Sequence, residues 1–226
     1  MKNVIVISLG GSLIVPGSVD YKYLLKFSKL IKKFSSRFKI VIVTGGGKTA
    51  RTYINALSNK TKDLRLLGAV GIMATKLNAR LVNGYFNIKQ NIPDSLLDVK
   101  KYLEKNNIVV CGALGFQPNM TSDGDACEIA AYLNGEFINL TNVDGLYDKN
   151  PHKFKNAKLI PKISFKDFLA IVNKIKYSAG QHFVLDQAAA KIILKSKIKT
   201  VILNGNNLKN LENYLNDKNF VGTEIL

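Results

Sequence analysis

The sequence predicts an α/β fold in which a mostly parallel central sheet is flanked by helices on both faces. Short apolar runs alternate with longer amphipathic stretches along the 226 residues. Continuous apolar runs are typical of parallel strands that are covered on both sides. Glycine-bearing loops follow four of these runs, as in sheets whose ligands bind at the strand ends. We expect one domain over residues 1–226, because a chain of this length buries a sizeable core.

The expected elements follow from these patterns. Apolar runs predict strands at residues 3–9, 39–44, 108–111, 137–141 and 199–203. Helical spacing predicts helices at residues 23–34, 50–57, 70–81, 125–133, 165–174 and 186–196. In the first of these helices, Leu24, Phe27, Ile31 and Phe34 share one face, and lysines lie opposite. The strands and helices alternate, which favours a sheet built from parallel crossovers.

A run of glycines, Gly45-Gly46-Gly47, closes the second strand and opens the next helix. Glycines allow a ligand to approach the backbone, and the helix N-terminus attracts anions. Lys48 and Arg51 add positive charge at the same place. The pattern predicts a phosphate site, although a plain strand-to-helix turn is an alternative.

The other glycine-bearing loops are Gly10-Gly11-Ser12, residues 112–115 and residues 141–145. Parallel strands bring their carboxyl ends to one edge of the sheet, so these loops are expected to meet. One site for a polyanion therefore explains all of them better than independent turns do.

The net charge of +17 indicates an anionic partner: a nucleic acid, an acidic membrane surface or a phosphorylated metabolite. The lysines are spread along the chain, which favours a solvated basic surface. No apolar run reaches the roughly 20 residues that cross a bilayer, and no signal-peptide pattern is present. Cys111 and Cys127 are too few for a disulfide framework, so we expect reduced thiols in a cytoplasmic protein. His152 and His182 lack the spacing of metal ligands.

Taken in order, the motifs resemble those of the amino-acid-kinase fold family and, within it, the archaeal type of uridylate (UMP) kinase. The resemblance covers nearly the whole chain and rests on Gly10-Gly11-Ser12, residues 45–54, Gly71-Ile72, residues 74–79, Gly115-Phe116-Gln117-Pro118, residues 141–147, Lys191-Ile192-Ile193 and Gly222-Thr223. It implies phosphoryl transfer from ATP, with Mg²⁺, to UMP. It also implies an acceptor-binding portion at roughly residues 1–135, an ATP-binding portion at roughly 136–226, and a homo-oligomer, a hexamer built from dimers.

The resemblance also implies roles for individual residues. The residues expected at ATP are Gly11, Ser12, Gly47, Arg51, Thr141, Asn142, Asp144 and Tyr147. Those expected at UMP are Gly46, Phe116, Gln117, Pro118, Asn119, Met120, Thr121 and Ser122. Lys48, Lys191 and Gly11 are expected to act on the transferring phosphate, and no protein ligand to a metal is expected.

The chain departs from the family pattern at several places. Ser8 stands where many members have a lysine, so Lys48 or Lys191 must supply that charge. Gly68 stands where UMP kinases usually have an aspartate for the ribose, and Asp63 is a nearby replacement. Asp123 or Asp125 occupies the family's aspartate position after the third loop, and Asp125 is the better match. Asn119 and Asn150 are further differences.

Several residues have alternative interpretations. Ser12 is also a candidate helix cap, Arg51 a surface ion-pair residue, and Asp144 a turn former. Asn78 fits a packing or inter-subunit role as well as a substrate role, and Lys191 fits an exposed helix lysine. For the whole protein, the alternatives are a kinase of the same fold with another phosphorylated or carboxylated acceptor, and a silent nucleotide-sensing or nucleic-acid-binding protein.

Overall fold

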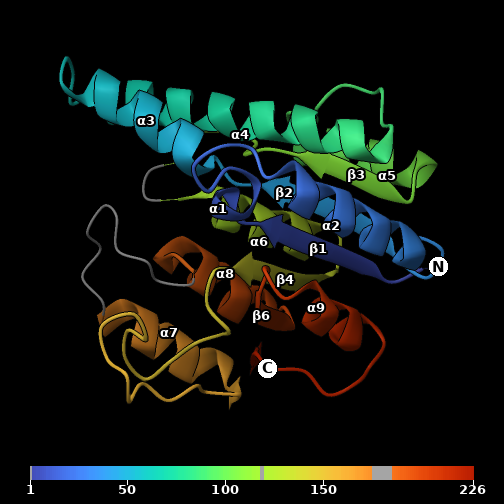
Figure 1. Ribbon diagram of the computed structural model, residues 1–226, viewed down its shortest axis with the longest axis vertical. Coiled ribbons are helices and arrows are strands. Elements are labelled where there is room, and N and C mark those ends of the chain that lie inside the picture. Colours follow the sequence, from blue (N-terminus) through green and yellow to red (C-terminus); the bar gives the residue numbers. More distant parts are fainter. Residues whose placement is uncertain (1, 118–119, 175–184) are drawn as a thin grey trace.

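The computed structural model describes residues 2–117, 120–174 and 185–226 (Figure 1). Its centre is a seven-stranded sheet in the order β3-β2-β1-β4-β6-β7-β5. The strands are β1 (Val4–Leu9), β2 (Lys39–Thr44), β3 (Ile108–Cys111), β4 (Glu136–Thr141), β5 (Lys162–Ile163), β6 (Thr200–Asn204) and β7 (Thr223–Ile225).

The first five strands of this order are parallel, as the sequence predicts. Strand β1 pairs with β2 on one side and β4 on the other, so that Ile7 lies beside both Ile42 and Ile138. Strand β7 is antiparallel to β6, and β5 is parallel to β7. The strand order reverses beside β1, because β2 and β3 are added to the sheet on one side of β1, and β4 and β6 on the other. Such a reversal is the usual ligand site of open α/β sheets.

Helices cover both faces of the sheet (Figure 1). They are α1 (Gly11–Ile14), α2 (Tyr21–Phe34), α3 (Gly47–Ser58), α4 (Leu64–Phe86), α5 (Leu96–Lys105), α6 (Ser122–Tyr132), α7 (Phe165–Lys174), α8 (Gln187–Ser196) and α9 (Leu208–Leu215). The core on one face is completed by α2, α9 and the second half of α4, and the core on the other by α5, α6, α7 and α8.

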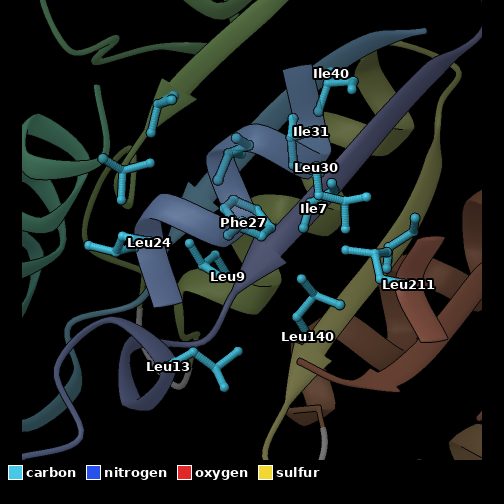
Figure 2. Packing of buried hydrophobic residues seen from close by; sticks show 14 of the residues in the cluster. Ile7, Leu9, Leu13, Leu24, Phe27, Leu30, Ile31, Ile40, Leu140 and Leu211 are labelled. Atoms are coloured by element: carbon cyan, nitrogen blue, oxygen red, sulfur yellow. The ribbon is translucent and has the colours of Figure 1, made fainter. Parts of the chain in front are cut away.

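The first core shows why α2 forms where it does. Leu24, Phe27 and Ile31 point from one side of α2 onto Ile7 and Leu9 of β1 (Figure 2). All five side chains are almost fully buried. Each fully buried side chain of this size stabilises the fold by roughly 1.5–3 kcal/mol. The opposite side of α2 carries exposed lysines, as the helical spacing indicates.

All of the predicted strands and helices are present, and most bounds agree within three residues. The largest difference is α4, which extends six residues before and five after the predicted helix at 70–81. The pattern missed α1, α5, α9, β5 and β7. Helix α1 and strands β5 and β7 are short, so their own residues carry little periodic signal, whereas α5 and α9 are longer but mix charged or polar residues with apolar ones. Among the described residues, no helix has the length and apolar character needed to span a membrane.

Candidate active site

The glycine-bearing loops all lie at the carboxyl ends of the parallel strands. In the order of the sheet, the loop after β3 comes first, then the loops after β2, β1, β4 and β6. Since neighbouring strands lie about 4.8 Å apart, these loops form a row about 19 Å long. The two central loops are therefore flanked by one loop on the β3 side and two on the β4 and β6 side.

The two central loops touch through their backbones. A Cβ on Gly11 would lie 2.1 Å from the backbone nitrogen of Gly47 and 2.7 Å from the carbonyl carbon of Gly45. Gly47 has φ +60°, and a Cβ there would lie 2.3 Å from the Gly11 carbonyl oxygen. No side chain larger than hydrogen fits at either position. Gly46, predicted to face UMP, caps α3, and Ser12, predicted to face ATP, lies inside α1, whose N-cap is Gly10, so the helix-cap interpretation of Ser12 is wrong.

Buried polar side chains of helix α4 form hydrogen bonds with the loops after β2 and β3. The Asn78 side-chain amide donates to the Gly45 carbonyl at 2.7 Å. Thr75 accepts from the backbone N–H of Ala113 at 2.9 Å, and its own carbonyl accepts from the Thr44 hydroxyl at 2.8 Å. Asn78 therefore has the packing role that was one of its two interpretations, and its substrate role stays untested. The contacts of Thr75 with Thr44 and Ala113 were not predicted, because only the tertiary fold brings α4 beside these loops.

The predicted cations occupy different places. Lys48 and Arg51 are exposed on the first turns of α3, directly after Gly47. Within the described residues, no carboxylate forms an ion pair with either of them, so Arg51 has no surface partner there. Lys191 is exposed on α8, which packs against α6 and α7. No described contact joins Lys191 to the glycine loops, and its catalytic role stays a prediction.

The loop after β4 is held by side chains. Asp144 accepts from the Asn204 amide at 3.0 Å and from the Tyr147 hydroxyl at 3.4 Å. Burial, with Asp144 as a further cause, raises the pKa of Tyr147. Thr141 is half-buried at the end of β4, and Asn142 is exposed beside it, where a ligand can reach both. Asp144 thus connects the β4 and β6 loops, and Asn204 is a site residue that the sequence analysis missed.

A residue near the end of the described chain also supports this loop. The Thr223 hydroxyl accepts from the backbone N–H of Leu146 at 2.8 Å and donates to the Ile160 carbonyl at 2.6 Å. A Cβ on Gly145 would lie 2.6 Å from the same oxygen. The Gly222-Thr223 motif therefore fixes the β4 loop from strand β7, which lies beyond β6 in the sheet.

The segment predicted to hold UMP lies on the β3 side. Gln117 donates to Glu128 at 3.2 Å, Met120 packs against Gly124, and Thr121 is the N-cap of α6. Ser122 opens α6, and the Thr121 hydroxyl donates to Asp186, the N-cap of α8, at 2.6 Å. Pro118 and Asn119 lie outside the described residues. Asp186 thus ties this segment to α8, a contact that no local motif indicates.

Asp123, rather than Asp125, faces the first strand. The Ser8 hydroxyl, at the position where many family members have lysine, donates to Asp123 at 2.6 Å. Burial raises the pKa of Asp123 to about 6, against the opposing effect of the Ser8 hydrogen bond. Asp125 instead accepts from the Leu114 backbone N–H at 3.1 Å, and burial raises its pKa to about 7. Asp123 therefore contacts the strand that carries Ser8, and Asp125 the loop after β3; which of them occupies the family's aspartate position stays a prediction.

Asp63, the suggested replacement for the family's aspartate at Gly68, has a different role in the structure. Its carboxylate accepts from the backbone N–H groups of Arg65 at 2.8 Å and Leu66 at 3.4 Å, so it caps α4. Gly68 is five positions further along the helix, about 7.5 Å along its axis. The space at Gly68 is occupied by the ring of Phe116, because a Cβ there would lie 2.3 Å from the ring.

The residues that the structure describes contain no group of three or more His, Cys, Asp or Glu side chains arranged to hold a metal ion. Mg²⁺ in phosphoryl-transfer sites is commonly held by phosphate oxygens and water, with one or two carboxylates. Backbone loops and exposed cations beside them fit a metal that arrives bound to a nucleotide. The geometry is thus that of a site for two phosphorylated molecules.

Comparison with known proteins agrees with this geometry. Residues 3–204 match the model of the amino acid kinase family. The chain is 32% identical to the uridylate kinase of Methanobrevibacter smithii, with 98% of each chain covered. It is 36% identical to that of Thermoplasma volcanium, over 100% of this chain and 98% of the relative. The crystal structure of uridylate kinase from Archaeoglobus fulgidus superposes over the whole of both chains with a TM-score of 0.86 and 31% identity. The chain belongs to the amino acid kinase family.

Proposed function

We propose that this protein is a UMP kinase, which transfers the γ-phosphoryl group of ATP to the phosphate of UMP and releases UDP and ADP. The name shared by the relatives in three archaeal genera supports the assignment. The observation that carries it is the backbone contact between Gly11 and Gly47 at the centre of the row of loops. Two phosphates that exchange a phosphoryl group must meet at one point, and this contact provides it.

The flanking loops then separate the two substrates. The loops after β4 and β6, with Thr141, Asn142, Asp144 and Tyr147, bind ATP. The loop after β3, from Phe116 to Ser122, binds UMP. Residues 1–135 thus form the acceptor portion and residues 136–226 the ATP portion of one continuous sheet.

The reaction needs positioning and charge neutralisation more than acid–base chemistry. A phosphate oxygen of UMP attacks the γ-phosphorus of ATP, and the bond from that phosphorus to the β-phosphate bridging oxygen breaks. The N-terminus of α3, with Lys48 and Arg51, stabilises the charge on the phosphates, and Lys191 is the second candidate for this role. Mg²⁺ held by the phosphates of ATP would neutralise further charge.

A coupled assay of ADP release tests the proposal, with UMP, CMP, glutamate, acetylglutamate and isopentenyl phosphate as acceptors. We expect turnover with UMP to exceed that with every non-nucleotide. Turnover only with a non-nucleotide would assign another acceptor to the same fold. ATP binding without transfer to any acceptor, or salt-sensitive binding of RNA, would favour a sensing or nucleic-acid-binding role.

We also propose that the enzyme is a cytoplasmic homo-oligomer, a hexamer by resemblance. Leu66, Met73 and Leu77 form one stripe of α4, and they are 54%, 65% and 62% exposed. The stripe lies opposite the face that carries Asn78 and the other buried residues of α4. A helix that is apolar on both sides is normally buried on both sides, which supports a second copy of the chain on the outer face.

Sedimentation velocity of a Leu77→Lys variant tests this interface. We expect smaller assemblies than those of the unmodified chain, because a charge in an apolar interface must be desolvated. The matched control is Leu97→Lys on α5, which is 70% exposed and lies outside the stripe. Unchanged sedimentation of Leu77→Lys would exclude this face as the interface.

A further inference from the structure

One turn of α4 lies directly beside the glycine loop that receives the acceptor phosphate. A Cβ on Gly46 would lie 3.6 Å from the carbonyl oxygen of Gly71. Gly68 is three positions earlier on the same helix, about 4.5 Å along its axis. A furanose ring attached to a phosphate at Gly46 extends over a similar distance. The sugar of a nucleoside monophosphate therefore reaches the turn between Gly71 and Gly68.

The Phe116 ring covers Gly68. A Cβ on Gly68 would lie 2.3 Å from Cδ2 and 2.5 Å from Cε2 of Phe116, so the ring packs on the bare helix backbone. Phe116 remains 38% exposed. A side chain at Gly68 and a ring at this position exclude each other. The two residues thus form one wall, which is apolar and open on its outer side.

This wall offers a sugar no side-chain hydrogen-bond acceptor. Gly68 has no side chain, and the Phe116 ring can provide only van der Waals contact. The carboxylate that precedes them on α4, that of Asp63, is occupied by two backbone N–H groups at the start of the helix. A site strongly prefers a ligand with a hydroxyl over one without it only when buried polar groups of the site bond that hydroxyl. Those groups are left unpaired when the ligand lacks it.

We propose that the Gly68–Phe116 pair determines sugar specificity and makes the enzyme tolerant of a 2′-deoxyribose, so that dUMP is an acceptor comparable to UMP. The proposal rests on the UMP kinase function proposed above and adds the sugar class that the site accepts. The ring holds the sugar by packing, and this contact is the same for both nucleotides. The Gly68–Phe116 pair then makes no contact that distinguishes ribose from 2′-deoxyribose.

Steady-state kinetics with UMP and dUMP test the proposal. For the unmodified enzyme, we expect kcat/KM values for the two acceptors within about fivefold of each other. Phe116→Ala should lower both values by about tenfold, because packing against the sugar is lost in each case. The double variant Gly68→Asp with Phe116→Ala places a carboxylate where the ring was. It should favour UMP over dUMP by at least about tenfold.

Two matched variants separate these effects from general damage. Gly84→Ala adds a methyl group to the same helix in open space, and Tyr132→Ala removes another half-exposed aromatic ring. Neither should change the ratio of kcat/KM values or their size. Gly68→Ala, in contrast, must displace the Phe116 ring and should lower both values.

The outcomes distinguish this proposal from the function on which it rests. A preference for UMP over dUMP of more than about 100-fold in the unmodified enzyme would overturn the sugar assignment and leave the kinase intact. If neither nucleotide is phosphorylated, the UMP kinase function fails. Calorimetric titration of the two nucleotides then still decides the sugar assignment, which equal affinities support and tight binding of UMP alone contradicts. Binding of neither nucleotide overturns both proposals.

Discussion

The centre and the flanks of the row of loops are built by different means. At the centre, Gly11 and Gly47 meet backbone to backbone, with no space for a Cβ. On the flanks, side chains make the contacts: Asp144 binds Asn204 and Tyr147 on one side, and Thr121 binds Asp186 on the other. The central positions accept only glycine, whereas each flank depends on hydrogen bonds between side chains.

This difference indicates that the central loops and the flanking loops serve different purposes. Backbone N–H groups bind any phosphate in the same way, so the central loops suit phosphoryl transfer in general. Side chains can change from one family member to another, and Gly68, covered by Phe116, is such a departure from the family pattern. In the proposed function, the backbone of the central loops therefore determines the chemistry, and the flanking side chains determine which substrates bind.

The largest effect is expected at the centre. Gly47→Ala combines a positive φ with a Cβ 2.3 Å from the Gly11 carbonyl oxygen. The two loops must separate, so we expect kcat to fall by at least about 10³-fold, as when a transition-state donor is lost. The same assay should show little change for Gly17→Ala, whose Cβ would meet nothing within 4 Å. Turnover of Gly47→Ala close to that of the unmodified enzyme would remove the contact from the mechanism.

A smaller effect is expected under the β3 flank, where Asp125 is 2% exposed and has its pKa raised to about 7 by burial. Glu128, Asp186 and Asp123 raise it further, and the Leu114 N–H opposes them. A carboxyl whose pKa is higher in the folded state stabilises the fold most below its unfolded pKa, near 4. That stabilisation is lost as the pH rises through 7.

Asp125→Asn keeps an acceptor for the Leu114 N–H but does not titrate. Urea unfolding between pH 4 and pH 8 should show the unmodified chain losing about 4 kcal/mol more than the variant over this range. Parallel stability curves would mean that Asp125 has an ordinary pKa in the folded protein.

The smallest effect is expected at the β4 flank. Asn204→Ala removes the amide that donates to Asp144 at 3.0 Å, while the glycine loops remain in place. We expect the KM for ATP to rise about tenfold, with the KM for UMP and the melting temperature nearly unchanged. An equal rise in both KM values would show that this flank does not serve ATP alone.

Much of the fold could be predicted from the sequence because its strands are buried on both faces. Strand β2 has the predicted bounds, since all of its residues from Ile40 to Thr44 are buried and apolar or small. Strand β7 could not be predicted, because Thr223–Ile225 becomes a strand only through its pairing with β6. Helix α9 was missed although Leu208, Leu211 and Leu215 recur at helical spacing, because it spans only eight residues.

The candidate site was predictable where glycines mark it and not where side chains complete it. The contact between the loops after β1 and β2 follows from the parallel sheet and the positions of Gly11 and Gly47. The Asn78 bond to Gly45 joins residues 33 positions apart, and local patterns contain no information about it. The bond between Ser8 and Asp123 also could not be predicted, because only the structure shows which of the two carboxylates reaches Ser8.

Two consecutive residues of α4, about 100° apart around the helix, have different surroundings. Asn78 holds the carbonyl of Gly45, and Leu77 presents its side chain to the outside. In the proposed oligomer, a neighbouring copy would rest on Leu77, within one helix diameter of the phosphate loop. If the neighbouring copy holds α4, and through Asn78 the Gly45 carbonyl, in the position that favours nucleotide, affinity for nucleotide and self-association raise each other by the same factor. Specific activity is accordingly expected to fall on dilution and to recover when acceptor is added.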